Sequence, residues 1–241
     1  MDIIKLDTAD STNSWVAAHE KELPSPALVY CVDQTEGRGQ RGNSWESAPG
    51  LNITASLLFH PEDFLAEWQF LISENIALAI ISFLKDLGVE AKVKWPNDIY
   101  VGDRKICGIL VEHVVTGKFI TRTIAGFGIN INQTEFLSDA PNPVSLSMLT
   151  GEKYNLENAL AKLSLHLEKF LRDIHQGISS HILFMKMLWR NDGNFYKFVD
   201  RKKDEPIEAC IQEVAPTGML TLQTREGDIR DFAFKEVEFV L

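Results

Sequence analysis

Two short segments concentrate cations, glycines and indole rings in a chain that is otherwise acidic. They are Gly37-Arg38-Gly39-Gln40-Arg41-Gly42-Asn43-Ser44-Trp45 and, some fifty residues on, Lys94-Trp95-Pro96-Asn97-Asp98. Glycines let main-chain N–H groups approach a phosphate or a carboxylate closely, and arginine adds a fixed, forked donor. A nearby tryptophan offers an apolar face for a base. Together the two segments predict ATP-dependent chemistry on a small anionic ligand.

The first segment has the spacing G-x-G-x-x-G, which is weak evidence by itself. A dinucleotide-binding fingerprint needs a strand before the glycines and a helix directly after them. Residues 27–32 are typical of a strand, but Pro49, Gly50 and the strand-like residues 53–59 follow Gly42, so no helix begins there. Kinase motifs and a Walker lysine are also missing from the sequence. We therefore expect a loop between strands that folds over a ligand, with an ordinary surface turn as the alternative.

Composition sets the class of protein. A chain of 241 residues with 45% hydrophobic content is long enough for one large domain with a small one appended. The formal net charge of −10 argues against a broad nucleic-acid surface. The start of the chain resembles no signal peptide, and the longest apolar run, residues 76–84, is too short to span a bilayer. The odd set Cys31, Cys107 and Cys210 predicts reduced, buried thiols and a cytoplasmic protein.

Hydrophobic periodicity predicts an α+β fold. Helical spacing over residues 14–23 and 62–87 predicts a short helix and a core helix, which ends at Gly88. Alternation then predicts a strand at 89–95, a hairpin of 99–101 with 105–112, and a strand at 120–129. Such neighbours favour a mixed, mostly antiparallel sheet flanked by helices over a doubly wound parallel sheet.

The rest of the chain divides at about residue 192. A loop at 133–143 precedes two predicted helices, 156–174 and 178–189. Short strands follow at 207–214, 219–223, 229–234 and 237–240, with glycine-containing turns between them. This pattern predicts a small barrel of SH3 size. We expect a catalytic domain over 1–192 and an SH3-like domain over 193–241.

Five motifs in order give the chain a close resemblance to the biotin protein ligase family. They are Asp10-Ser11-Thr12-Asn13; Gln34 with the glycine loop and Trp45; residues 94–98; Arg104-Lys105 with Gly108-Ile109-Leu110; and Gly126-Phe127-Gly128-Ile129-Asn130. The resemblance extends over essentially the full chain and implies a fold like that of class II aminoacyl-tRNA synthetases. It also implies that biotin is joined to AMP, with release of pyrophosphate, and then transferred to a lysine of a biotin carboxyl carrier domain.

The resemblance also implies roles for individual residues. Biotin would be bound by Ser11, Thr12, Gln34, Gly37, Arg38, Lys105, Gly108, Leu110, Gly126 and Ile129. ATP and the adenylate would be bound by Arg38, Gly39, Gln40, Arg41, Trp45, Asn97, Lys105 and Asn130. Catalysis would fall to four of the charged residues, with Arg38 and Lys105 between the carboxylate and the α-phosphate, Lys94 near the phosphates and Asp98 at the acceptor amine. ATP and biotin would be substrates with Mg²⁺, and no protein-held metal site is expected.

Each role has a structural alternative. Arg38 could be a solvated turn residue, Lys105 a lysine on a hairpin edge and Lys94 an exposed strand residue. Ser11 and Thr12 could cap a helix, and Trp45 could belong to the core. His113 matches no family role, and we expect it at the surface.

Other functions remain open. A lipoate or octanoate ligase shares the implied fold, and a non-catalytic sensor of biotin or nucleotide is a further alternative. Many relatives carry an additional DNA-binding domain, but Ser11 comes so early that we expect no DNA partner. Gln40 stands where some relatives have another cation. We expect no membrane partner, and either a monomer or a homodimer.

Overall fold

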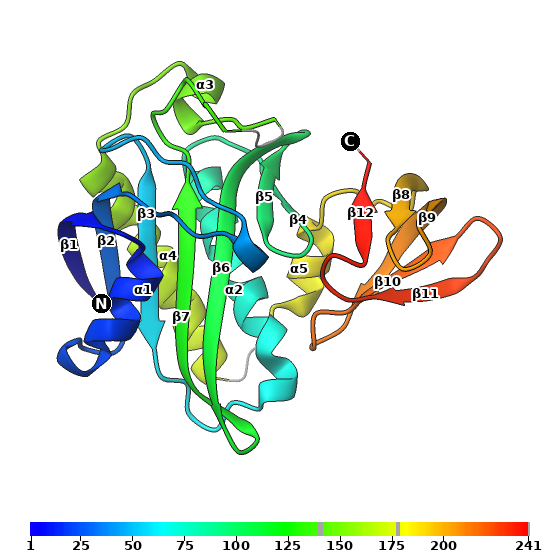
Figure 1. Ribbon diagram of the computed structural model, residues 1–241, viewed down its shortest axis with the longest axis horizontal. Coiled ribbons are helices and arrows are strands. Elements are labelled where there is room, and N and C mark those ends of the chain that lie inside the picture. The colour runs from blue at the N-terminus through cyan, green and yellow to red at the C-terminus, as the bar shows by residue number, and fades with distance from the viewer. Residues whose placement is uncertain (139–141, 177–178, 241) are drawn as a thin grey trace.

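The computed structural model describes residues 1–138, 142–176 and 179–240, and it contains two β-sheets joined through a shared core (Figure 1). The larger sheet has seven strands in the order β1-β2-β3-β7-β6-β5-β4. Only β1 and β2 pair in parallel, and the remaining neighbours are antiparallel. Its strands are β1 (Asp2–Ala9), β2 (Ala27–Gln34), β3 (Ile53–Phe59), β4 (Lys92–Lys94), β5 (Asp98–Val101), β6 (Arg104–Thr116) and β7 (Phe119–Ile129).

Helices cover both faces of this sheet. The apolar stripes of α2 (Gln69–Asp86) and α4 (Leu156–His175) pack on one face, behind the sheet in Figure 1. The short α1 (Thr12–His19) packs on the other face, where Val16 contacts a small cluster of Val29, Leu58 and Ile124. The remaining helices are α3 (Leu146–Thr150), α5 (His181–Met187) and the single 3₁₀ turns η1 (Glu20–Glu22), η2 (Gln40–Gly42) and η3 (Ala66–Trp68).

The second sheet is antiparallel and small. Its five strands follow the order β11-β10-β9-β8-β12 and comprise β8 (Tyr196–Asp200), β9 (Glu205–Val214), β10 (Leu220–Thr224), β11 (Ile229–Phe232) and β12 (Val237–Phe239). We call it the C-terminal sheet. It is fastened to the large sheet by Trp95, whose Nε1 donates to the carbonyl of Gly218 at 3.0 Å and whose ring meets Phe234 edge-on. Because one core cluster includes residues of both sheets, the boundary near residue 192 stays a prediction.

The predicted fold class is confirmed, including the hairpin of β5 and β6 and the small C-terminal β module. The prediction omitted β1, α3 and β8. The predicted loop over 133–143 has no helix or strand over 133–138, and its residues 139–141 lie outside the described part of the chain. The three cysteines are free and buried, as expected.

The stretch Ala66–Asp86 is long and apolar enough to cross a membrane by length and composition, but 67% of the apolar 18-residue window within it is buried inside the protein, where α2 lies in the core. The expectation that His113 lies at the surface was wrong. His113 is a half-buried residue within β6 rather than a surface residue, and its Nδ1 lies 2.9 Å from the hydroxyl of Thr123. Burial lowers the pKa of His113 to about 4, so the ring is neutral at physiological pH.

Candidate active site

A cavity of about 840 Å³ opens between the large sheet and the C-terminal sheet. Most of the predicted site residues line it: Ser11, Thr12, Gln34, Arg38, Gly39, Gln40, Trp45, Lys94, Asn97, Asp98, Lys105, Gly108, Leu110 and Gly126. They come from the N-terminus of α1, the end of β2, the glycine loop after it, strands β4, β5, β6 and β7, and the turn between β4 and β5. Five motifs separated in sequence therefore meet at one place.

One end of the cavity is a chain of neutral polar groups. The amide oxygen of Gln34 accepts from the backbone N–H of Thr12 at 2.9 Å and from its hydroxyl at 3.2 Å. The hydroxyl of Ser56 lies 2.7 Å from the Thr12 hydroxyl and 2.6 Å from the amide oxygen of Asn13. Thr12, Asn13 and Ser56 are all nearly inaccessible to solvent. We call this set of four residues the polar end; its hydrogen bonds fix the donors and acceptors offered to a ligand.

The structure does not support the alternative that Ser11 caps helix α1. Ser11 is the residue before α1, but its side chain makes no capping hydrogen bond. Its backbone N–H is bonded to the carboxylate of Asp10 instead, at 2.6 Å. Ser11 and Thr12 are buried and line the cavity, and the Thr12 hydroxyl is bonded to Gln34.

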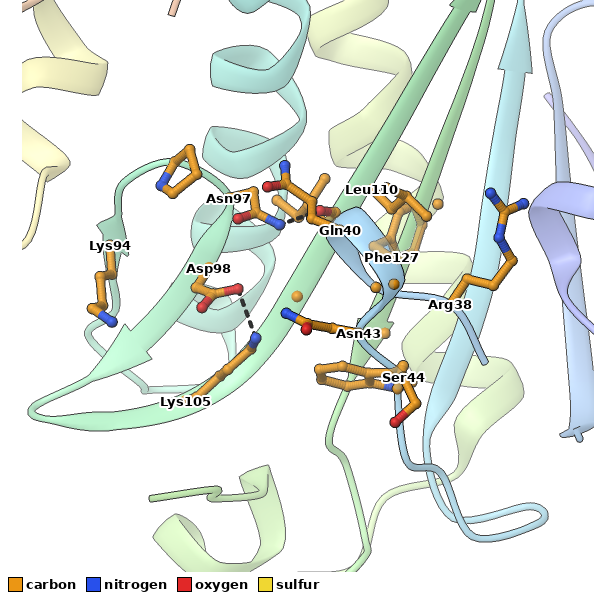
Figure 2. A pocket seen from close by; sticks show the side chains of 18 of the residues that line it. Arg38, Gln40, Asn43, Ser44, Lys94, Asn97, Asp98, Lys105, Leu110 and Phe127 are labelled. Atoms are coloured by element: carbon orange, nitrogen blue, oxygen red, sulfur yellow. Dashed lines mark hydrogen bonds and ion pairs between the residues drawn. The ribbon is translucent and has the colours of Figure 1, made fainter. Parts of the chain in front are cut away.

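Arg38 lies beside the polar end and not beside the lysines. Its Nη2 lies 2.9 Å from Glu112 Oε1 and its Nη1 lies 3.3 Å from the Ser14 hydroxyl. Figure 2 shows its side chain pointing away from Lys105 and Asp98. Arg38 and Lys105 therefore pair with different carboxylates, Glu112 and Asp98.

The other end of the cavity is cationic. Lys105 Nζ lies 2.7 Å from Asp98 Oδ1, and both side chains are about a quarter exposed (Figure 2). Lys94 Nζ is 3.3 Å from the hydroxyl of Tyr100. Burial lowers the pKa of Lys94, and the nearby Asp98 carboxylate partly offsets this effect. We call Lys94, Asp98 and Lys105 the cationic end.

The alternative reading of Lys105 as an edge residue is wrong, since β6 lies between β5 and β7 inside the sheet. Lys94 is likewise half-buried rather than a fully exposed strand residue. Lys94 and Lys105 are therefore both less exposed to solvent than a lysine on a free surface.

Trp45 lies over a strip of glycines that joins the two ends. Gly108 and Gly128 are paired across β6 and β7, and a Cβ on Gly128 would lie 2.2 Å from the indole Nε1. Lys105 Nζ lies 5.6 Å from the indole centroid. Trp45 is half-buried, and its Nε1 has no hydrogen-bond partner among the described residues. The ring thus both packs on the sheet and forms part of the cavity wall.

Asn97 connects the cavity wall to β6. Its side-chain amide donates to the carbonyl of Ile109 at 2.6 Å, and its own carbonyl accepts from the Ile109 N–H at 2.9 Å. These bonds hold the turn of residues 94–98 against the sheet, and Asp98, which follows Asn97, points toward Lys105 (Figure 2).

Three predicted residues whose side chains the structure describes, Gly37, Ile129 and Asn130, are not part of the lining. Ile129 and Asn130 are buried behind it, and the Asn130 amide donates to the carbonyl of Val144 at 3.1 Å. Gly37 also lies behind the wall; a Cβ there would be 2.3 Å from the Trp45 carbonyl, so close backbone packing requires glycine. Arg41 is in η2, and its side chain lies outside what the structure describes.

Several residues that line or support the cavity were not predicted. Asn13 was part of a quoted motif but had no role, and Ser56 and Glu112 were not considered. A polar residue within the apolar strand Ile53–Phe59 was the available signal for Ser56. The C-terminal sheet adds Val237, Glu238 and Phe239 from β12, together with Lys235 from the preceding turn. No local pattern marks these four residues.

The charge of the lining is opposite to that of the whole chain. Among the described residues, four cations and two carboxylates line the cavity: Arg38, Lys94, Lys105 and Lys235, with Asp98 and Glu238. The protein as a whole carries a net charge of −10. A cationic cavity in an acidic protein concentrates and holds an anionic ligand. Within the described residues, no group of three or more His, Cys, Asp or Glu side chains is placed to hold a metal ion.

Solved structures share this architecture. A biotin protein ligase from Aquifex aeolicus in complex with biotin and ATP superposes with a TM-score of 0.79 at 22% identity, covering 99% of each chain. The biotin protein ligase of Leishmania major in complex with biotin gives a TM-score of 0.59 over 97% of this chain and 99% of that one, at 20% identity. The fold is therefore the one seen in biotin protein ligases.

Sequence comparison identifies the family. Residues 5–130 match the Biotin/lipoate A/B protein ligase family, and the chain belongs to it. The Bifunctional ligase/repressor BirA of Bacillus subtilis is 30% identical over 236 residues, covering 93% of this chain and 70% of that protein. The Biotin--[acetyl-CoA-carboxylase] ligase of Paracoccus denitrificans is 31% identical over 167 residues, 66% of this chain and 68% of that one.

Proposed function

We propose that this protein is an ATP-dependent biotin–protein ligase. It joins the biotin carboxylate to the α-phosphate of ATP, releases pyrophosphate, and transfers the biotinyl group to a lysine of a biotin carboxyl carrier domain. The observation that carries the proposal is one cavity with a neutral polar end and a cationic end. Biotin has the matching form, with a neutral ureido ring at one end and a carboxylate at the other. A relative named as a biotin ligase supports the same assignment.

Recognition of biotin falls to the polar end. The ureido ring has two N–H donors and one carbonyl acceptor in an otherwise apolar bicycle, so it needs paired polar groups in a dry site. Ser11, Thr12 and Gln34 supply such groups, and Arg38 lies beside them. Gly126 has no side chain to obstruct the slot, and Leu110 pairs with it across the strands as an apolar wall.

Activation falls to the cationic end. Two anions must approach each other before the carboxylate oxygen can attack the α-phosphorus, and the bond from that phosphorus to pyrophosphate then breaks. Lys105 reduces this repulsion and stabilises charge that develops on phosphorus. Lys94, Gly39, Gln40, Arg41 and Asn97 would bind the nucleotide with it, with Trp45 as the platform for adenine. Gly37, Ile129 and Asn130 would support this site from behind the cavity wall.

Transfer completes the reaction at the same end. The carrier amine attacks the acyl carbon, the bond to AMP breaks, and the amine loses a proton. Asp98, already at the cavity wall beside Lys105, would orient the amine and accept that proton. Mg²⁺ would enter with ATP, since such ions are commonly held by one or two carboxylates and the substrate phosphates. Asp98 and Glu238 are the described carboxylates in the lining.

The cellular setting is part of the proposal. Three free, buried cysteines suit a cytoplasmic enzyme. The net charge of −10 gives no electrostatic basis for binding DNA, and the expected partner is a carboxylase carrier domain. A monomer or a homodimer is equally compatible with the proposed chemistry.

Lipoate ligation is the main competing function, because the family includes enzymes of that kind. The polar end favours biotin: lipoate has a dithiolane ring, which offers no N–H or carbonyl to Thr12 and Gln34. The test is the intact mass of a carboxyl carrier domain after incubation with the protein, Mg-ATP and either biotin or lipoate. One biotinyl group per carrier and one pyrophosphate per transfer are expected. Equal or greater transfer of lipoate would overturn the assignment.

A further inference from the structure

Glu112 on β6 connects the glycine loop to the polar end. Its Oε1 accepts from Arg38 Nη2 at 2.9 Å, and its Oε2 accepts from the Asn13 side-chain amide at 2.7 Å. Asn13 in turn accepts from Ser56, which contacts Thr12. The carboxylate of Glu112 thus links Arg38, which lies 74 positions earlier in the chain, to Asn13, which lies 99 positions earlier.

The bridge requires a carboxylate. Each oxygen serves a different donor, and an ionised carboxylate is the one protein side chain of this size that offers two acceptors and no donor. Glutamine at this position would present one acceptor and one N–H₂ group to two donors. Either Arg38 or Asn13 would then lose its bond to this residue, and the bridge between them would break, although Arg38 would keep Ser14 and Asn13 would keep the carbonyl of Leu110.

Glu112 also sets the charge of this end of the cavity. It does not itself line the cavity, but it neutralises Arg38, which does. At the other end, Lys94 and Lys105 face Asp98 alone within β4, β5 and β6, so that end keeps a positive charge. A ligand with a neutral head and an anionic tail therefore has one favoured orientation.

We propose that Glu112 is a positioning and specificity-determining residue that holds Arg38 at the polar end and keeps that end neutral. Through this bridge it determines which end of the ligand enters. The inference rests on the proposed function and extends it to a residue that does not touch the ligand.

The test is Glu112→Gln, measured by calorimetric titration of biotin without nucleotide. An ion pair with side chains 48% and 37% exposed contributes little to stability, so the variant should fold normally. We expect the Kd of biotin to rise about 10-fold or more, as is usual when a hydrogen bond to a charged group is lost. The rate of pyrophosphate release at saturating biotin should change little, because Lys105 is untouched. A purely structural defect would not separate KM from kcat in this way.

Two further variants complete the design. Glu36→Gln is the matched control, since it removes an equal charge from an exposed residue two positions before Arg38 and should leave biotin affinity unchanged. Arg38→Gln should weaken biotin binding at least as much as Glu112→Gln, and the double variant should lose little more than Arg38→Gln alone. Arg38→Gln also keeps the inference testable if Glu112→Gln does not fold.

Three outcomes would overturn the inference: wild-type affinity in Glu112→Gln, wild-type affinity in Arg38→Gln, or losses that add in the double variant. A wild-type protein that does not bind biotin would instead contradict the proposed function. The two failures are therefore distinguishable in one set of titrations.

Discussion

The two ends of the cavity are built differently. At the polar end, Thr12, Asn13 and Ser56 are nearly inaccessible to solvent, and each is hydrogen-bonded to a neighbour. At the cationic end, Lys105 and Asp98 are about a quarter exposed and pair mainly with each other. Buried, fully bonded groups are rigid and discriminate between ligands, whereas accessible charges can exchange partners as a reaction proceeds.

The difference indicates a division of labour between recognition and chemistry. Variants of the polar end should change the affinity for biotin and leave the chemical step nearly intact. Variants of the cationic end should change the rate of adenylation and leave biotin affinity nearly intact. Each prediction below tests whether the two ends behave independently.

Lys105→Ala should have the largest effect. Its stabilisation is worth more in the transition state than in either ground state, and loss of one preorganised electrostatic donor typically costs about 2.7–4 kcal/mol, roughly 10²–10³-fold in rate. We expect pyrophosphate release to slow by that factor while the Kd of biotin alone changes little. Rapid-quench measurement of pyrophosphate, with presynthesised biotinyl-adenylate to bypass the first step, provides the check. Adenylation at the normal rate would remove Lys105 from the mechanism.

Gly126→Ala and Gly128→Ala form a matched pair on one strand, two residues apart on the same face. A Cβ on Gly126 would lie 2.2 Å from the Asn13 amide oxygen, and one on Gly128 would lie 2.2 Å from the Trp45 ring. Overpacking of this kind costs about 1–3 kcal/mol. We expect Gly126→Ala to weaken biotin binding and Gly128→Ala to weaken ATP binding, each by about that amount. Equal losses of both ligands in both variants would show that the two ends are not independent.

Trp45→Ala should have an effect in the same range. Base–aromatic stacking is worth about 1–3 kcal/mol per base, and the affinity for ATP should fall accordingly while the affinity for biotin without nucleotide stays nearly constant. Because Trp45 also packs on Gly108 and Gly128, thermal unfolding must be measured alongside. Unaltered ATP affinity together with a lower melting temperature would assign Trp45 to packing alone.

Elements whose hydrophobic residues recur at a clear period could be predicted from the sequence. Alternating Val93 and flanking lysines marked β4, and the long apolar stripe marked α2. It was insufficient for β1, an edge strand whose side chains are largely exposed, so that no buried face imposes a pattern. The five-residue α3 is too short for periodicity, although its cap Ser145 and the αL residue Gly151 are ordinary boundary signals.

Site residues could be predicted where reactive side chains lie close together in the sequence. Lys94 and Asp98 belong to one turn, and Lys105 lies on the strand paired with β5. Glu112 could not be found this way, because its role depends on a contact to Asn13 across 99 positions. The same holds for Phe239, which reaches the cavity only because the C-terminal sheet docks beside it. Such contacts are set by tertiary packing, which no local motif encodes.

Trp95→Phe should have the smallest effect and separates docking from chemistry. The indole N–H donates to the buried carbonyl of Gly218, and the ring meets Phe234 at 5.3 Å. Phenylalanine keeps an aromatic contact but loses the donor, so the free energy of unfolding should fall by about 0.5–1.5 kcal/mol. Chemical denaturation measures this, and Trp68→Phe is the control because that side chain is 46% exposed. If docking of the C-terminal sheet only completes the cavity wall, Trp95→Phe should leave the Kd of biotin and the rate of adenylation nearly unchanged. A large loss of either in a well-folded variant would mean that the position of the C-terminal sheet controls one end of the cavity, and the identity of the lost function would show which end.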